Sequence, residues 1–304
     1  MHDVIIIGGS YAGLAAAMQL GRARRSVLIL DAGERRNRFA HHSHGFLGRD
    51  GAAAADIAAE GREQVLRYPT ITWQEARVTE TRATAGGFTV RTESGEHSAQ
   101  RLILATGVVD ELPDIPGLRE RWGQSVFHCP YCHGYELDRG RLGILASGPL
   151  AAHHSMLVAE WGGVGQTTLF VNGVFEPTPE ELAELAARKI QVERATVTAA
   201  QGDAPGISLQ LSDGRVAVLD GLFAMPHTRL AAPFAEQLGC ALEAGPMGAY
   251  YKTDFAKETT VPGVFACGDA AQPGAAVAIA VADGTMAGIG THRSLVFPKV
   301  AVAG

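Results

Sequence analysis

The sequence predicts an α/β protein in which a strand, glycine turn, helix and strand occur twice. The first copy begins at the apolar run 4–7, and the second begins at the expected strand 141–146, which is apolar after Arg141. Continuous apolar runs of this length are typical of buried parallel strands. A Cys-x-x-Cys turn, Cys129 to Cys132, lies between the two copies. We therefore expect parallel sheets covered by helices, with a reactive turn between two similar units.

Composition limits the possible partners. The chain has 304 residues, of which 46% are hydrophobic and 19% charged, enough for one large or two medium domains. The net charge of −6 and the lack of long basic clusters argue against nucleic acid. No apolar run approaches the ~20 residues of a membrane span. The N-terminus shows no signal-peptide pattern, so we expect a cytoplasmic protein and no membrane partner.

The first unit carries a nucleotide-binding pattern. The sequence Gly-Gly-Ser-Tyr-Ala-Gly at 8–13 follows the first strand and opens a helical pattern, and a second strand at 27–30 ends in Asp31. This matches the dinucleotide-binding fingerprint, with Ser10 at the middle glycine. The glycines let the backbone approach a pyrophosphate at the helix N-terminus, and Asp31 would accept hydrogen bonds from a ribose. The alternative is a structural turn without a ligand.

The region up to residue 117 continues the α/β pattern. An alanine-rich helix is expected at about 51–66, and short strands are expected at 71–73, 76–81, 88–92 and 101–105. Ala-Thr-Gly follows at 105–107. The Pro/Gly cluster at 113–117 is typical of a domain boundary.

The second unit is degenerate. Ala146 stands where the first glycine belongs, Gly148 remains, and Pro149 follows. Strands are expected at 167–171, 191–195, 207–211 and 216–219. A second Gly/Pro boundary lies at 243–246. After it, a strand within 261–269 ends in Gly-Asp, and a helix of small residues begins near Gly274.

Four pieces together point to a family: the turn at 8–13, Ala-Thr-Gly at 105–107, the Cys-x-x-Cys turn, and the segment 263–269. With them the chain resembles the low-molecular-weight thioredoxin reductases from end to end. The resemblance implies two doubly wound, Rossmann-like domains. The FAD domain would be discontinuous, 1–115 and 245–304. A pyridine-nucleotide-type domain, 116–244, would be inserted and carry the cysteines. It also implies a homodimer.

The resemblance also assigns cofactor contacts. Those to the pyrophosphate and adenosine fall on Gly8, Ser10, Tyr11, Ala12, Asp31, Ala32 and Val78. Those to the ribitol and flavin fall on Asn37, Ala105, Thr106, Gly107, Gly268, Asp269, Ala276, Val277 and Ala278. Residues 276–278 would open a helix aimed at the flavin, where its N-terminus stabilises a reduced, anionic ring.

Some residues depart from the reductases. Ala146 and Pro149 spoil the second glycine turn, and the acids Glu176 and Glu180 stand where those enzymes have arginines for NADPH. A 2′-phosphate needs cationic donors. His133 replaces an aspartate after the second cysteine. With these departures the chain resembles the dithiol oxidases of disulfide natural-product pathways, of the gliotoxin and holomycin oxidase type. Those enzymes close a small-molecule dithiol and pass electrons through FAD to oxygen.

On this basis we expect Cys129, Cys132 and His133 to be catalytic. Cys129 would form the mixed disulfide with the substrate, Cys132 would face the flavin, and His133, with a pKa near its ordinary ~6.5, would take protons. One alternative is a thioredoxin reductase acting on a thioredoxin-like protein, with NAD(P)H, ferredoxin or another flavin as donor. Another is a non-enzymatic flavoprotein that senses redox state.

The cysteine turn has other possible interpretations. Cys129 to His133 matches the haem c attachment pattern, the turn with His128 and His133 could bind zinc, and the cysteines could form a purely structural pair. We expect no metal site, either here or at the histidines of 41–44. Cys240 and Cys267 lie in apolar patterns and are expected in the core.

Overall fold

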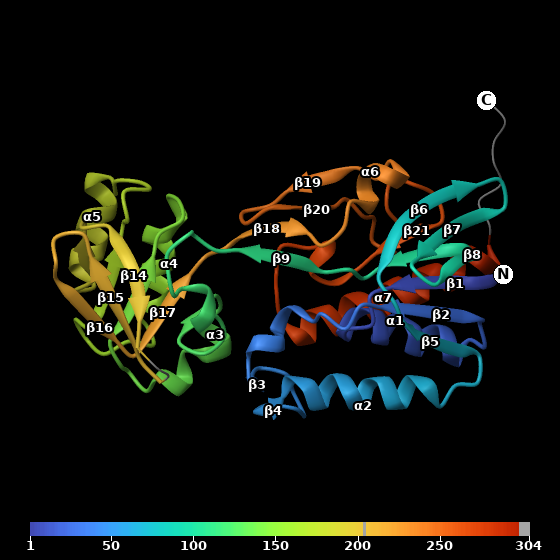
Figure 1. Cartoon of the computed structure of the whole chain (residues 1–304), viewed down its shortest axis with the longest axis horizontal. Coiled ribbons are helices and arrows are strands. Elements are labelled where there is room, and N and C mark those ends of the chain that lie inside the picture. The colour runs from blue at the N-terminus through green and yellow to red at the C-terminus, as the bar shows by residue number, and fades with distance from the viewer. Residues whose placement is uncertain (203–204, 298–304) are drawn as a thin grey trace.

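The computed structural model describes residues 1–202 and 205–297, which form two lobes joined by a narrow ribbon (Figure 1). The ribbon consists of β9 (Val108–Glu111) and β18 (His227–Leu230), which pair antiparallel with Asp110 opposite Thr228. The first lobe contains both the beginning and the end of the described chain, and the second lobe contains its middle.

The first lobe is built on a seven-stranded sheet with the order β5-β2-β1-β8-β7-β6, in which β21 also pairs with β8. The strands are β1 (His2–Ile7), β2 (Val27–Asp31), β5 (Ile71–Glu75), β6 (Val78–Thr84), β7 (Gly87–Thr92), β8 (Gly95–Leu104) and β21 (Val264–Ala266). The pairs β5–β2, β2–β1, β1–β8 and β8–β21 are parallel. Their carboxyl ends therefore lie along one edge of the sheet.

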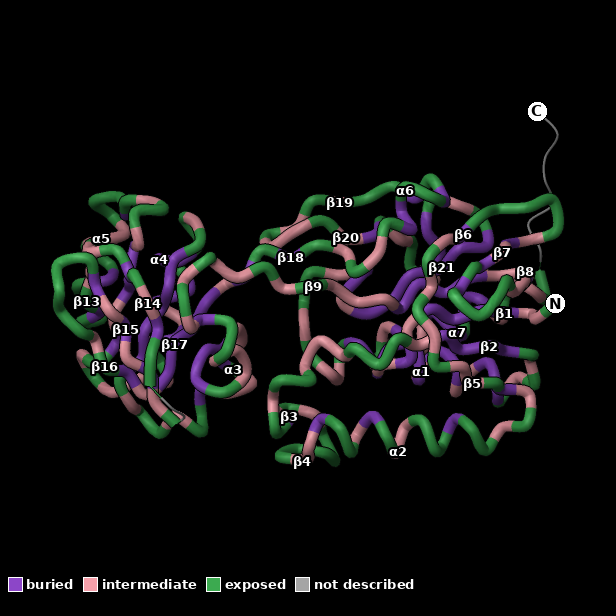
Figure 2. The backbone as a smooth tube through the Cα atoms, in the orientation of Figure 1, coloured by how far each residue is buried: buried purple, intermediate pink, exposed green. Residues whose placement is uncertain are grey.

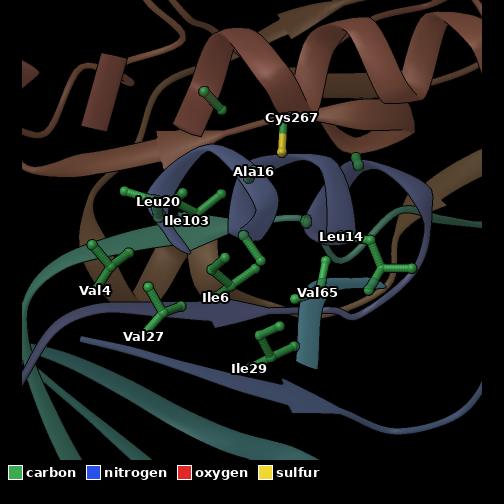
Figure 3. Close-up of a cluster of buried hydrophobic side chains, with 14 of the residues drawn as sticks. Val4, Ile6, Leu14, Ala16, Leu20, Val27, Ile29, Val65, Ile103 and Cys267 are labelled. Carbon is green, nitrogen blue, oxygen red and sulfur yellow. The ribbon is translucent and has the colours of Figure 1, made fainter. Parts of the chain in front are cut away.

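Three helices cover this sheet: α1 (Tyr11–Arg22), α2 (Ala54–Leu66) and α7 (Val277–Val296). α1 and α7 cross in close contact, because a Cβ on Gly284 would lie 2.0 Å from the Ala12 carbonyl oxygen. Cys267 points into the buried cluster around α1, as predicted for the core (Figure 3). Shorter elements are η1 (Arg36–Phe39), β3 (His42–Ser43), β4 (Ala52–Ala53) and η4 (Gly268–Ala270).

The second lobe has a five-stranded parallel sheet with the order β10-β17-β11-β12-β13, and a separate antiparallel sheet, β14-β15-β16. The strands are β10 (Val126–Phe127), β11 (Leu142–Leu145), β12 (Thr167–Phe170), β13 (Gln191–Glu193), β14 (Val197–Gln201), β15 (Ile207–Leu211), β16 (Val216–Leu219) and β17 (Gly221–Ala224). The helices are α3 (Pro130–His133), α4 (Leu150–Val158) and α5 (Pro179–Ala187), and the 3-10 turns are η2 (Arg119–Arg121) and η3 (Tyr135–Leu137). Burial follows the strands in both lobes (Figure 2).

The predicted α/β class with two Rossmann-type sheets is confirmed, and most predicted strands are present. The strand expected at 216–219 is β16, but the sequence analysis missed β17, which follows after Asp220 alone. The chain passes from one sheet to the other at Asp220, whose carboxylate accepts hydrogen bonds from the backbone and side chain of Arg141. β17 is therefore a central strand of the parallel sheet and not an extension of β16.

The second domain boundary needs a different position from the one expected at 244/245. α6 (Phe234–Leu238) packs its Phe234 and Leu238 into the core of the first lobe with Ile5. β19 (Leu242–Ala244) pairs with β20 (Ala249–Tyr251) beside it (Figure 1). We propose that the inserted domain ends at β18. In the described part of the chain, no helix is long and apolar enough to cross a membrane.

Candidate functional site

The expected nucleotide-binding residues gather at the carboxyl edge of the first sheet. The turn at 8–10 follows β1, Asp31 ends β2, residues 105–107 follow β8, and Gly268 and Asp269 follow β21. These strands are parallel neighbours, so their following loops meet at one place. Val78 is near this edge as well, since Ala76 donates its N–H to the Asp31 carbonyl, 2.9 Å away.

The glycine turn forms a cradle that side chains would fill. Gly8 has a φ of +102°, and a Cβ there would lie 2.3 Å from the Ala105 carbonyl oxygen. A Cβ on Gly13 would lie 1.9 Å from the Gly8 carbonyl oxygen. Ser10 is the N-cap of α1, and no side chain caps the helix. The first-turn N–H groups of α1 are thus available to an anion.

Polar side chains around the cradle fit a bound nucleotide. The Asp31 carboxylate accepts the Gly9 N–H at 2.9 Å, which fixes the acid beside the turn. Asn37 donates to the Tyr11 hydroxyl at 3.0 Å. The Thr106 hydroxyl oxygen is buried, and no partner within the described residues satisfies it. A buried polar group without a partner is costly, so the residues present fit a bound cofactor.

Two cradle residues were missed by sequence reasoning. The Trp73 ring lies against Gly9, where a Cβ would be 2.1 Å from it. Its indole N–H is buried without a partner in the described structure. Arg36 donates to Asp269 at 2.9 Å and also binds Asp110. A tryptophan in a short strand and an arginine in a loop show no spacing that would mark them in a sequence.

The predicted flavin helix begins where expected. Ala276 is the N-cap of α7, and Val277 and Ala278 are its first helical residues. The Gly268 N–H donates to Asp283 of the same helix at 2.8 Å, and Asp283 is paired with Lys257 at 2.8 Å. The turn that carries Asp269 is therefore fixed to α7.

The two cysteines of the central turn are joined in a disulfide, Cys129 to Cys132. Cys129 follows β10 at the edge of the parallel sheet and is the N-cap of α3, which begins at Pro130. Proline suits this first helical position because its missing N–H has no partner there in any case. Within residues 1–202 and 205–297, no group of three or more His, Cys, Asp or Glu side chains is arranged to hold a metal ion.

His133 directly follows Cys132 of the disulfide, but its pKa differs from the ordinary value that was expected. Its ring stacks on Phe127 with centroids 4.4 Å apart. Burial lowers the pKa of His133, and the carboxylate of Glu136 only partly opposes this effect. The expectation of an ordinary pKa is therefore corrected: the pKa of His133 lies below its ordinary value, so burial favours the neutral imidazole. Glu136 itself approaches His44 of the first lobe at 3.4 Å.

Two further histidines near the turn were not assigned a role from the sequence. His128 directly precedes Cys129, and burial together with the Arg36 charge lowers its pKa to about 4. Burial also lowers the pKa of His154 in α4 to about 4. Each has one buried ring nitrogen without a partner in the described structure. Both histidines are neutral at neutral pH.

The second glycine-type turn lacks the features of the first. Ala146 donates its N–H to Phe170 at 3.0 Å, as Gly8 does to Leu30 at 2.8 Å, so the two turns occupy equivalent places. Asp31 follows Leu30, and Val171 follows Phe170, so Val171 occupies the position equivalent to Asp31. The Val171 side chain is buried, with 3% exposed. A ribose would find no carboxylate there.

The expected acidic segment of this turn is also present. The Glu176 carboxylate is paired with Arg194 at 2.5 Å. Glu180 lies in the first turn of α5, which is closed by a capping box between Thr178 and Glu181.

Comparison with known proteins agrees with this geometry. Residues 2–284 match the family described as pyridine nucleotide-disulphide oxidoreductase. Thioredoxin reductase tcpT of Claviceps purpurea is 34% identical over 277 residues, 88% of this chain and 86% of that protein. An oxidoreductase structure from Agrobacterium tumefaciens is 55% identical with a TM-score of 0.93, covering 98% of this chain and 99% of that one.

The crystal structure of HlmI is 36% identical, with a TM-score of 0.90 over 97% of this chain and 92% of that one. The sheet edge with its glycine cradle, the disulfide turn and these matches agree with one another. The chain belongs to the pyridine nucleotide-disulphide oxidoreductase family, and it is a thioredoxin reductase-like enzyme of the flavin-dependent disulfide oxidoreductase kind.

Proposed function

We propose that this enzyme binds FAD and oxidises a small-molecule dithiol to a disulfide, with oxygen as the final electron acceptor. One observation carries the proposal: the disulfide turn and the intact cradle occur beside a second turn that has lost its nucleotide features. Ala146 and Val171 stand where a functional turn has glycine and an acid. Electrons then have an entry route through Cys129 and Cys132. The second turn offers no carboxylate to the ribose of NADH, and the acids Glu176 and Glu180 follow it where NADPH needs cationic donors.

The thiol chemistry follows from the disulfide. One substrate thiolate attacks Cys129, the Cys129–Cys132 bond breaks, and Cys132 leaves as a thiolate. The second substrate thiolate then attacks the substrate sulfur of the mixed disulfide and releases Cys129. The substrate loses two electrons and two protons, and the cysteines gain the two electrons. Bound FAD supplies the two-electron relay from this dithiol to oxygen, which leaves as hydrogen peroxide.

We propose that His133 moves the protons. A neutral imidazole accepts a proton from a substrate thiol, and a positioned base contributes typically ~100- to 10,000-fold to a rate. The lowered pKa of His133 keeps it in the accepting form at neutral pH. The same lowering removes the imidazolium charge that would otherwise stabilise a cysteine thiolate.

The chain's own residues would hold the cofactor as the resemblance suggests. The backbone of the turn 8–12 and the N-terminus of α1 would take the pyrophosphate, Asp31 the ribose, and Asp269 the ribitol. Residues 276–278 would place the N-terminus of α7 toward the flavin ring, where the helix dipole favours negative charge.

Cysteine variants test the proposed roles of the two thiols. In Cys129→Ser, the remaining Cys132 thiolate should give a long-wavelength charge-transfer band with the bound flavin. In Cys132→Ser the band should be absent, and Cys129 should trap the substrate as a mixed disulfide detectable by mass. A band that survives only in Cys132→Ser would reverse the roles. His133→Gln should slow reduction by dithiol about 100-fold; an unchanged rate would exclude His133 as the base.

A second candidate is a thioredoxin reductase working in the opposite direction. It is supported by the naming of relatives such as tcpT as thioredoxin reductases. It requires a donor, whether NAD(P)H, ferredoxin or another flavin. Reduction of a thioredoxin by the donor-loaded enzyme, faster than oxidation of any small dithiol, would favour this candidate.

A further inference from the structure

A partly buried arginine outside both turns joins the cofactor edge to the ribbon between the lobes. Arg36 lies in η1, after β2. Its Nε and Nη2 atoms donate side-on to the two oxygens of Asp110, at 2.9 and 2.5 Å. Its Nη1 atom donates to Asp269 at 2.9 Å. The side chains of Arg36, Asp110 and Asp269 are only 18%, 9% and 20% exposed.

The charges in this cluster make Arg36 indispensable to it. Two carboxylates face one guanidinium, and a carboxylate largely removed from water is destabilised when it loses its paired cation. Within the described residues, Arg36 is the only cation that forms an ion pair with either acid. The nearby Lys257 is committed to Asp283. The side-on pair with Asp110 fixes the guanidinium plane, and this plane directs Nη1 to Asp269.

Asp110 connects this cluster to the ribbon between the lobes. Asp110 belongs to β9, one of the two strands that pass between the lobes, and lies opposite Thr228 of β18. The next residue, Glu111, pairs with Arg229 on the same ribbon, but these side chains are 51% and 57% exposed. The ribbon thus carries one partly buried pair directed to the cofactor edge and one exposed pair that is not.

We propose that Arg36 is a positioning residue that couples the ribbon between the lobes to the cofactor turn. Asp110 fixes Arg36, and Arg36 fixes the Asp269 carboxylate in the orientation in which it accepts a hydroxyl of the cofactor. Asp110 thereby supports cofactor binding through Arg36. This inference rests on the FAD site of the proposed function, but not on the dithiol or on oxygen.

The test is titration of the apoprotein with FAD, followed by quenching of flavin fluorescence. Arg36→Met should raise the FAD dissociation constant ~10- to 100-fold, the scale of lost hydrogen bonds to a charged group. Asp110→Asn should raise it about 5-fold or more. The double variant should bind FAD no more weakly than Arg36→Met, since Asp110 acts through Arg36.

Controls separate this coupling from simple loss of stability. Glu111→Gln on the same strand should leave the dissociation constant within about 2-fold, because its pair is exposed. If Arg36→Met does not fold, the test uses Arg36→Lys and Asp110→Asn. Arg36→Lys keeps the positive charge but loses the side-on pair with Asp110. An unchanged constant in Asp110→Asn, with or without a lower melting temperature, would overturn the coupling. The coupling would also be overturned if the losses of FAD-binding free energy in the two single variants added up in the double variant.

The outcome is separable from the proposed function. Wild-type protein that takes up FAD but is insensitive to Asp110→Asn would refute the coupling alone. Intact coupling in a protein that no dithiol reduces would refute the dithiol oxidation alone. Wild-type protein that binds no FAD would refute both.

Discussion

The two glycine-type turns of this protein make equivalent backbone hydrogen bonds but carry different residues. Gly8 and Ala146 each follow the first strand of a unit and each bond to the second strand. Gly8 has a positive φ and touches the Ala105 carbonyl, whereas Ala146 is an ordinary buried residue. α1 begins three residues after Gly8, and α4 begins four residues after Ala146. Two parallel sheets can therefore share the same strand-to-helix connection while carrying different residues in it.

The comparison also extends to the ends of the second strands. Asp31 bonds to the first glycine turn through the Gly9 N–H, while Val171 is buried in the core of its lobe. The first unit has a polar side chain at this position beside its glycine turn, whereas the second has an apolar side chain that packs in the core. Under the proposed function, this difference between the two turns decides where electrons enter the enzyme.

The largest effect should come from breaking the intact turn. Gly8→Ala places a Cβ 2.3 Å from the Ala105 carbonyl at a positive φ, which should cost about 3 kcal/mol or more. We expect loss of the bound flavin, measured by absorbance of the purified protein. The matched change Ala146→Gly should cost only about 1 kcal/mol in stability and leave the flavin bound. Equal flavin loss in both variants would contradict the comparison.

A smaller effect should follow from removing the acid of the intact turn. Asp31→Ala should weaken FAD binding ~5- to 150-fold, because a hydrogen bond to a buried ligand is worth roughly 1–3 kcal/mol. Val171→Ala, at the equivalent place, should leave the FAD dissociation constant unchanged. Apoprotein titration measures both. Unchanged FAD binding by Asp31→Ala would show that the Asp31 carboxylate does not contribute to FAD binding.

The smallest effect concerns acid stability of the central lobe. The folded pKa of His154 is about 4, below the ~6.5 of the unfolded chain. Between these values the unfolded state binds more protons, so stability falls as pH drops from about 6.5 to 4 and levels off below. His154→Phe should reduce this loss by about 1–2 kcal/mol, measured by denaturant unfolding at pH 7 and 4.5. The exposed neighbour His153→Gln is the control; an equal change there would contradict the assignment.

Much of the fold and the site could be read from the sequence because periodicity and glycine spacing report local geometry. The strand–turn–helix units, Asp31, Asp269 and the cysteine turn all lie in such local patterns. β17 was missed because only Asp220 separates it from β16, and its partners β10 and β11 lie far away in the chain. The packing of α6 on the first lobe is also a long-range contact. Arg36 and Trp73 act through partners distant in the chain. The lowered pKa of His133 depends on burial, which its position in the turn does not reveal.

The central claim is that electrons enter through Cys129 and Cys132 and not through the central turn. The direct measurement is anaerobic reduction of the bound flavin in the wild-type enzyme by NADPH, NADH or a dithiol such as dithiothreitol, each added separately. The dithiol should bleach the flavin rapidly, and NADPH should do so about 100-fold more slowly, since lost charge-assisted phosphate contacts are worth about 3 kcal/mol. Rapid bleaching by micromolar NADPH would contradict the claim and favour the reductase direction.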